Sequence, residues 1–215
     1  MNAEVFRAWI ANAAEVIEAN RDRLTQLDAA IGDADHGINL THGFTAVLAA
    51  LKAPDSRPAP TTPGKILVLT GNTLMAKVGG ASGPLYSVAF RCAGKSLGDA
   101  ADVDLAALST ALEAALSGVQ KVGAALEGDK TMVDALAAGT RAFSKAIAEG
   151  ASQDDALSSL AQAASAASAA TIPMKAWKGR ASYRGARGVG HEDPGAASAA
   201  LILGALRDAA RATAV

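Results

Sequence analysis

Apolar residues recur every three or four positions along most of the chain, the spacing that places side chains on one face of an α-helix. The first run predicts one amphipathic helix over residues 3–29, with apolar positions at Phe6, Trp9, Ile10, Ala13, Val16, Ile17, Leu24 and Leu27. A second helix is predicted to begin near Ile38, with Phe44, Val47, Leu48 and Leu51 on one face.

Six further helices are predicted, at about residues 63–78, 84–97, 104–122, 131–149, 153–171 and 194–212. Thr62 before Pro63 is typical of a capped helix start, because proline fits the first helical turn. Residues 53–63 are rich in proline, and residues 178–195 are rich in glycine and basic side chains, so both are expected to be loops. The pattern therefore predicts about eight helices.

Composition strengthens this all-α prediction. The chain has 215 residues, of which 50% are hydrophobic and only 4% aromatic, and alanine is the most abundant residue. Alanine is the best helix former, whereas strands favour β-branched and aromatic residues. An all-β sandwich is thereby excluded, and the length fits a single domain over residues 1–215.

Charge and cysteine usage narrow the class of protein further. The net charge of −1 and the isoelectric point near 6.3 argue against a nucleic-acid-binding protein, which normally has a basic face. One cysteine, Cys92, allows neither an internal disulfide nor a cysteine zinc cluster, which favours a reducing compartment. The first residues do not read as a signal peptide, and no apolar run reaches the ~18 residues of a membrane span. We therefore expect a cytoplasmic protein.

The strongest chemical pattern is a group of three aspartates. Asp28, Asp33 and Asp35 lie within eight residues of one another, beside Gly32 and Gly37. Carboxylates held close together repel, and a cation between them relieves the repulsion. Oxygen ligands of this kind suit Mg²⁺, which usually also binds substrate phosphates. The same aspartates could instead cap helices and solvate a turn.

Three other segments also concentrate polar residues. Residues 79–84 form a glycine-rich turn that opens a helix, a favourable place for phosphate but also a common structural turn. Residues 128–132 offer Thr131 as a helix cap and Met132 as an apolar surface for a ring. In residues 178–195, one or two of the basic side chains could face a phosphate, and the rest would be solvated. A functional site requires all four segments to meet at one end of the helices.

Five motifs together resemble the ADP-binding subunit of dihydroxyacetone kinase. They are LDAAIGDADHGINLTHGF (27–44), VGGASGPL (78–85), GDKTM (128–132), KGRASY (178–183) and GHEDPGA (190–196). They occur in the family's order and span nearly the whole chain. The resemblance implies a closed barrel of eight antiparallel helices, with the nucleotide bound by loops at one end.

The resemblance also implies roles for individual residues. Asp28, Asp33 and Asp35 would hold two Mg²⁺ ions under the nucleotide, and Arg180 would join these aspartates as a catalytic residue by neutralising charge on the transferred phosphoryl group. The remaining implied nucleotide contacts are His36, Gly37, Ile38, Asn39, Ala81, Ser82, Gly123, Met132, Asp193, Pro194 and Gly195. Within this set, Gly123 and Met132 would line the pocket for the base and ribose.

The family's phosphotransferase-dependent branch implies a particular reaction. ADP stays bound as a coenzyme, a phosphohistidine of a donor protein converts it to ATP in place, and the phosphoryl group passes to dihydroxyacetone on a separate ketose-binding subunit. Two alternatives remain open from the sequence. One is a kinase subunit that exchanges free ATP and serves a related ketose or tetrose, and the other is a binding module whose nucleotide state signals to a transcriptional regulator.

Overall fold

The computed structural model describes residues 1–52 and 59–213. Its helices are α1 (Ala3–Ala19), α2 (Arg21–Ile31), α3 (His36–Lys52), α4 (Pro63–Lys77), α5 (Ser82–Leu97), α6 (Leu105–Gly123), α7 (Met132–Ala148), α8 (Gln153–Ala170), the 3₁₀-helix η1 (Arg180–Gly188) and α9 (Pro194–Ala212). Within these described residues there is no β-strand, only an isolated bridge between Asn2 and Asp102. The all-α prediction is therefore confirmed. Most of the predicted proline-rich loop at 53–63 lies outside the described residues.

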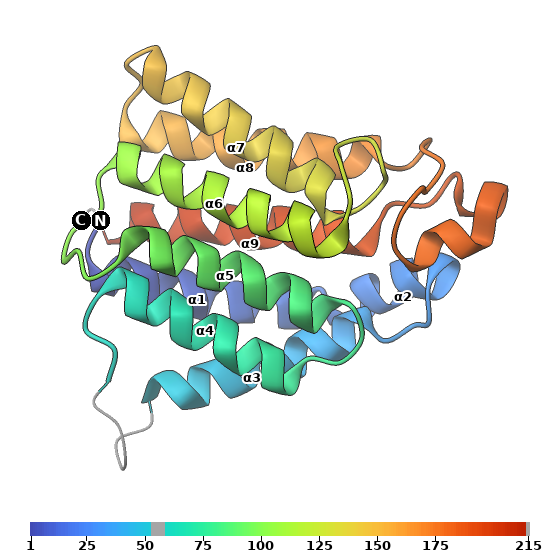
Figure 1. Cartoon of the computed structure of the whole chain (residues 1–215), viewed down its shortest axis with the longest axis horizontal. Helices are drawn as coiled ribbons and strands as arrows, with labels where there is room; N and C mark the ends of the chain where they lie inside the picture. The colour runs from blue at the N-terminus through green and yellow to red at the C-terminus, as the bar shows by residue number, and fades with distance from the viewer. Residues whose placement is uncertain (53–58, 214–215) are drawn as a thin grey trace.

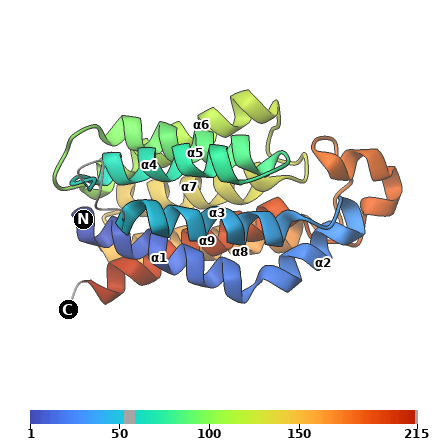
Figure 2. The same ribbon diagram turned by 90° about the horizontal axis from the view of Figure 1, so that it is seen from below.

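Eight of the helices form a ring. Each of α3 to α8 packs against the next α-helix along the chain, and α1 closes the ring by packing against both α9 and α3. Neighbouring helices run in opposite directions (Figures 1 and 2). Helix α2 extends beyond the ring and packs on α3, α9 and η1. This is the antiparallel helical barrel that the family resemblance implied.

Small residues let neighbouring helices approach closely. At the contact between α4 and α5, a Cβ added to Gly64 would lie 2.2 Å from the carbonyl oxygen of Gly98. One added to Gly94 would lie 2.6 Å from the carbonyl oxygen of Gly64. Because a side chain at either position would collide with backbone, these helices depend on glycine where they touch. The centre of the ring holds the larger side chains, including Phe6, Phe44 and Phe143.

The predicted single helix over residues 3–29 is wrong. The structure divides it at Asn20, where the backbone leaves helical geometry (φ −104°, ψ 10°). The Asn20 side chain donates a hydrogen bond to the carbonyl oxygen of Val16, at 2.8 Å, and so competes for the backbone acceptor that a continuous helix uses. The apolar spacing continues unchanged across this break, so the spacing gave no sign that the helix ends there.

The prediction that residues 178–195 contain no helix is also wrong. Residues 180–188 form η1, which Gly185 interrupts at φ 58°. Short-range hydrogen bonds, such as that from the Ser182 amide to the Gly179 carbonyl at 3.2 Å, stabilise turns of this type without the 3.6-residue period. The high glycine content of this segment predicted a loop, but short-range backbone hydrogen bonds form a 3₁₀-helix on either side of Gly185.

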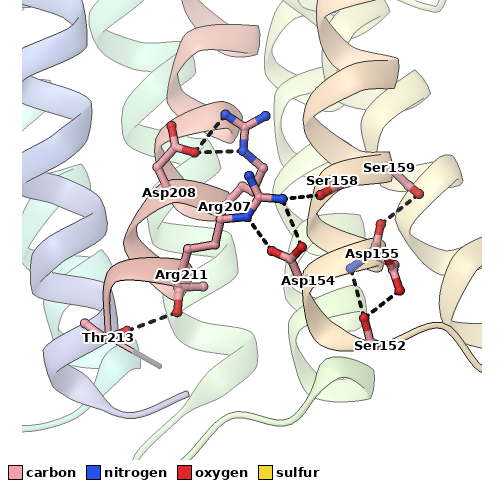
Figure 3. Close-up of polar contacts among 10 residues, drawn as sticks. Ser152, Asp154, Asp155, Ser158, Ser159, Arg207, Asp208, Arg211 and Thr213 are labelled. Atoms are coloured by element: carbon pink, nitrogen blue, oxygen red, sulfur yellow. Dashed lines mark hydrogen bonds and ion pairs between the residues drawn. The ribbon is translucent and has the colours of Figure 1, made fainter. Parts of the chain in front are cut away.

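The two ends of the ring differ in chemistry. At the end near the chain termini, Arg211 of α9 forms hydrogen bonds with Asp154 and Ser158 of α8, 2.9 Å long from its Nη2 atom (Figure 3). These side chains are exposed, so this ion pair contributes little to stability. The opposite end carries the four polar segments singled out above, the last of which contains η1 (Figure 1). Among the described helices, none is long and apolar enough to span a membrane.

The core makes a direct stability prediction. Phe44 is fully buried, and its ring meets that of Phe90 edge-on with 6.3 Å between centroids. Replacing Phe44 by alanine removes this packing and leaves a cavity, so we expect the free energy of unfolding to fall by about 3–5 kcal/mol in urea titrations. The control is Met75→Ala on the exposed face of α4, expected to change it by less than about 0.5 kcal/mol. Equal effects of the two variants would contradict this account of the core.

Candidate functional site

The four polar segments meet around one cavity of about 350 Å³. Helices α3, α5, α7 and α9 all begin at this end of the ring, so the positive ends of four helix dipoles face the same region. A cavity of this size can hold a small ligand, and the helix starts favour an anionic one. The sequence indicated that a functional site requires these four segments to meet at one end of the helices. In the structure they do meet there.

One wall of the cavity is acidic. The carboxylates of Asp28, Asp33 and Asp35 each offer a ligand oxygen, and these atoms lie within 4.8 Å of one another. Burial raises the pKa of Asp35, and the nearby charges of Asp33 and Asp28 raise it further. Such mutual repulsion is what a bound divalent cation would relieve, so the donor set fits Mg²⁺.

Asp28 is fixed by the backbone around it. One of its oxygens, Oδ2, accepts the amide N–H groups of Asp35 and His36, at 2.9 and 3.2 Å. Its other oxygen faces Gly32, where an added Cβ would lie 1.9 Å away. The sequence requires glycine here because a side chain would displace the carboxylate. Since Oδ2 is engaged by the loop, Oδ1 is the oxygen left for a cation.

Another part of the cavity lining is apolar, and we call it the apolar wall. Leu85, Val119, Ala125 and Met132 contribute to it, and all but Leu85 are buried. Gly123 ends α6 beside them, where an added Cβ would lie 3.3 Å from the Leu85 side chain. A cavity with both an apolar and a charged part suits a ligand with a flat ring at one end and phosphates at the other. Sequence reasoning found only Gly123 and Met132 on this wall.

Most of the predicted site residues share this cavity. The residues on its wall are Asp28, Asp33, Asp35, His36, Ala81, Ser82, Gly123, Met132, Arg180, Asp193, Pro194 and Gly195. The structure does not place Gly37, Ile38 and Asn39 there. Gly37 packs against the backbone of Arg21, where an added Cβ would lie 2.0 Å from the carbonyl oxygen, and Ile38 faces a shallow depression beside α2. The backbone N–H of Asn39 donates to the carbonyl oxygen of Asp35 at 2.8 Å, and its side chain lies beside Gly79, where an added Cβ would be 3.4 Å from the Asn39 Nδ2 atom.

His36 is the centre of a buried hydroxyl network. Its Nδ1 lies 3.0 Å from the Ser82 hydroxyl and its Nε2 lies 2.8 Å from the Ser198 hydroxyl, which in turn lies 2.6 Å from the Tyr86 hydroxyl. Burial lowers the pKa of His36 to about 4, so the ring is neutral at physiological pH. His36 therefore orients Ser82 at the start of α5. The sequence did not indicate Tyr86 or Ser198, the other two members of this network.

Arg180 reaches the acidic wall from η1. Its Nη1 atom lies 2.7 Å from Oδ2 of Asp33, and both side chains are partly exposed. From the same helix, Arg184 donates to the carbonyl oxygen of Gly32 at 3.1 Å. Of the basic residues in this segment, Lys178 and Arg180 line the cavity. The guanidinium of Arg180 is thus beside the position where a phosphate on the metal site would carry its charge.

The structure thus defines an all-helical barrel whose one end carries three aspartates that fit a divalent cation, on a cavity suited to an anionic ligand. A family model described as the DAK2 domain matches residues 30–208, and the chain belongs to this family. This confirms the resemblance found in the five motifs. The family's fold accounts for the eight-helix ring.

Individual relatives agree with this assignment. The chain is 37% identical, over 198 residues and 92% of each sequence, to "PEP-dependent dihydroxyacetone kinase 1, ADP-binding subunit DhaL" of Listeria innocua. It is 36% identical over 203 residues to the Escherichia coli protein named "PEP-dependent dihydroxyacetone kinase, ADP-binding subunit DhaL", covering 94% of this chain and 95% of that protein. Human "Triokinase/FMN cyclase" is 36% identical over 86% of this chain and 31% of its own length.

A solved structure shares the fold. The dihydroxyacetone kinase of C. freundii, determined in complex with AMP-PNP and Mg²⁺, superposes with a TM-score of 0.70 at 25% identity. The match covers 97% of this chain and 34% of that one, so this chain spans about a third of the solved kinase.

The buried carboxyl of Asp193 makes a pH prediction. Burial and the nearby Asp134 raise its pKa to about 7 from an ordinary 3.8, while the N–H of Ala196 and the charge of Lys130 oppose the shift. Between these two pH values the folded chain holds a proton that the unfolded chain has released, so Asp193 contributes less stability as pH rises. Asparagine also caps helices but does not titrate. We therefore expect Asp193→Asn to be more stable relative to wild type at pH 8 than at pH 5.

Urea unfolding of both proteins at the two pH values measures this difference. Asp154→Asn is the control, because its exposed carboxylate is stabilised by Arg211 and its pKa is lowered rather than raised. Parallel stability curves for wild type and Asp193→Asn would contradict the raised pKa of Asp193.

Proposed function

We propose that this chain is the ADP-binding subunit of a dihydroxyacetone kinase of the phosphotransferase-dependent kind. It holds ADP as a coenzyme with two Mg²⁺ ions, accepts a phosphoryl group on that ADP from a phosphohistidine donor protein, and passes it to dihydroxyacetone on a partner subunit. The observation that carries the proposal is the cluster of Asp28, Asp33 and Asp35 on a cavity where four helices begin. The DhaL relatives, matched over nine-tenths of their length, support it.

Some residues of the cavity would bind the metal and the nucleotide, and others would neutralise negative charge. Asp28, Asp33 and Asp35 would hold the metal, and the apolar wall with Gly123 and Met132 would take the adenine ring. Mg²⁺, when bound, would neutralise charge on the phosphate oxygens. The Ser82 hydroxyl, oriented by His36, lies at the start of α5 where a phosphate would sit.

Phosphoryl transfer needs alignment and charge neutralisation more than it needs an acid or a base. Arg180 is suited to neutralisation because its guanidinium is permanently charged and sits at the edge of the acidic wall. Arg180 lies on η1, which covers the side of the cavity that carries the aspartates. Dihydroxyacetone would be held by the partner subunit, so this chain would supply the nucleotide half of the reaction.

A second candidate is a kinase subunit that exchanges free ATP. Triokinase/FMN cyclases of several mammals match 86% of this chain at 36–37% identity, and the same cavity would serve free ATP equally well. Reconstitution with a ketose-binding subunit separates the two candidates. We expect product from a phosphohistidine donor at nucleotide levels no higher than the protein concentration, whereas a dependence on excess free ATP would favour the second candidate.

The metal site makes the first functional prediction. We expect purified protein to retain ADP with about two Mg²⁺ ions through gel filtration, because carboxylates and phosphates share the metal. Asp33→Asn removes one anionic ligand and should abolish retention while leaving the helical circular dichroism unchanged. Asp99→Asn, at an exposed aspartate paired with Lys65, is the matched control and should retain nucleotide. Denatured wild-type protein that releases no nucleotide, together with no thermal shift on adding Mg-ADP, would refute the coenzyme proposal.

Arg180 makes the second functional prediction. Its charge matters most where negative charge develops, so Arg180→Ala should slow phosphoryl transfer by about a hundredfold while changing Mg-ADP affinity far less. Arg187→Ala, on the same 3₁₀-helix, is the control and should leave both quantities unchanged. Transfer rates in the reconstituted system and calorimetric titration with Mg-ADP measure the two effects. Equal losses in rate and affinity would make Arg180 a binding residue only.

A further inference from the structure

Lys130 is a lysine with no exposed surface, just before α7. Its backbone has φ 61°, a left-handed conformation that favours glycine or asparagine. Burial lowers the pKa of its ammonium group, and Asp193 opposes that shift. A lysine is therefore costly here both in backbone conformation and in desolvation, so its side chain must make interactions that offset the cost.

The ammonium group of Lys130 is surrounded by backbone carbonyl oxygens of one segment. Its Nζ lies 2.6 Å from the carbonyl oxygen of His191, 2.7 Å from that of Gly188, 3.1 Å from that of Met174 and 3.4 Å from that of Ile172. An ammonium has three N–H donors, and the three shorter distances match them. Hydrogen bonds from a charged donor are about twice as strong as neutral ones.

These four carbonyls lie on both sides of η1. Ile172 and Met174 precede it, and Gly188 and His191 come at and after its end, so the segment leaves the barrel and returns to it at one point. The amide of Gly190 also donates to the carbonyl of Ile172, at 2.8 Å, across this point. We call residues 172–191 the η1 loop, and its two end segments, at 172–174 and 188–191, the neck of that loop.

The η1 loop has few other buried contacts with the rest of the chain. Its only buried residues within η1 are Ala181 and Gly188, and its apolar contacts form a small cluster with Ile31 and Ala176, separate from the main core. On the other side, the Arg180–Asp33 ion pair is partly exposed and therefore weak. Loops with few buried apolar contacts open readily, so the hydrogen bonds from the buried Lys130 ammonium to the neck determine how firmly the loop is anchored.

We propose that Lys130 is a positioning residue that closes the neck of the η1 loop and so holds Arg180 over the cavity. The anchoring itself follows from the contacts of Lys130, whereas its consequence for the nucleotide rests on the proposed function. Loss of the Lys130 charge releases both ends of the loop together. Arg180 then moves away from the aspartates, and a bound nucleotide leaves faster.

Cleavage by an arginine-specific protease tests the anchoring without nucleotide. The η1 loop carries Arg180, Arg184 and Arg187, all exposed, and a lysine variant changes none of these sites. Lys130→Met keeps an unbranched apolar chain but removes every donor. We expect cleavage within η1 to be about tenfold faster or more, because charged hydrogen bonds are lost. The matched control is Lys175→Met, an exposed lysine in the same loop, expected to be cleaved at the wild-type rate.

Hydrogen exchange distinguishes local opening from loss of the fold. In Lys130→Met, the amides of Gly190 and Trp177, which bond to the carbonyls of Ile172 and Asp129, should exchange faster, while amides in the centre of α4 and α9 keep their rates. A folded Lys130→Met protein with wild-type cleavage and exchange would overturn the proposal. Should Lys130→Met fail to fold, wild-type exchange decides: slow exchange at Gly190 and Trp177 supports a closed neck, and unprotected exchange overturns it.

A separate titration with Mg-ADP connects the loop to the nucleotide. Wild-type protein and Lys175→Met should bind with the same affinity, and Lys130→Met should release Mg-ADP about tenfold faster in a stopped-flow chase. If wild type binds no Mg-ADP, the proposed function fails, while the cleavage and exchange results on the neck still stand. If Lys130→Met shows a loosened neck but wild-type nucleotide release, the loop does not control the nucleotide and the functional half of the proposal is wrong.

Discussion

Repulsion among three carboxylates is the constraint on which the site end of this barrel depends. Asp28, Asp33 and Asp35 place ligand oxygens within 4.8 Å of one another, an arrangement that raises the pKa of Asp35 together with its burial. Two features of the chain hold them there. Backbone N–H groups at the start of α3 bind Asp28, and Gly32 leaves room for its second oxygen. The starts of four helices then add positive potential to the same cavity.

Burial reduces the charge of two polar groups beside this cluster. His36 is neutral because it is buried, and its two ring nitrogens lie within hydrogen-bonding distance of the hydroxyls of Ser82 and Ser198. Asp193 caps α9 through the N–H of Ala196, and burial raises its pKa. Beside three carboxylates, burial therefore favours the neutral forms of His36 and Asp193, which limits the electrostatic cost of folding.

Much of this structure could be predicted from the spacing of residue types along the sequence. Apolar periodicity predicted the helices of the ring, because each helix buries one continuous face, and the caps at Thr62 and Thr131 are where the sequence predicted them. Closely spaced residue types also predicted the aspartate cluster. The break at Asn20 escaped prediction because a side chain competing for a backbone acceptor leaves the apolar period intact.

Features that depend on distant parts of the chain could not be predicted in the same way. Lys130 contacts carbonyl oxygens 42 to 61 residues further along the chain, and a carbonyl has no residue type by which a pattern could find it. The network of Tyr86, Ser198 and His36 joins three helices through hydroxyl groups that are common in any sequence. The family resemblance implied Gly37, Ile38 and Asn39 as nucleotide contacts, but none of the three lines the cavity, because helical geometry turns successive residues to different sides.

A nucleotide that is retained as a coenzyme differs from one that is exchanged as a substrate in how fast it dissociates from the protein. Cavity chemistry alone would not separate them, because the acidic wall, the helix starts and the apolar wall would bind ADP and ATP through the same groups. How often the η1 loop opens is a separate property, because it depends on contacts outside those groups. In this chain its exposed contacts, Arg180 with Asp33 and Arg184 with Gly32, are individually weak, whereas the Lys130 side chain that binds the neck is fully buried. On the proposed function, the residence time of the nucleotide would therefore be set by Lys130 rather than by the three aspartates, because a coenzyme role requires this neck to open slowly.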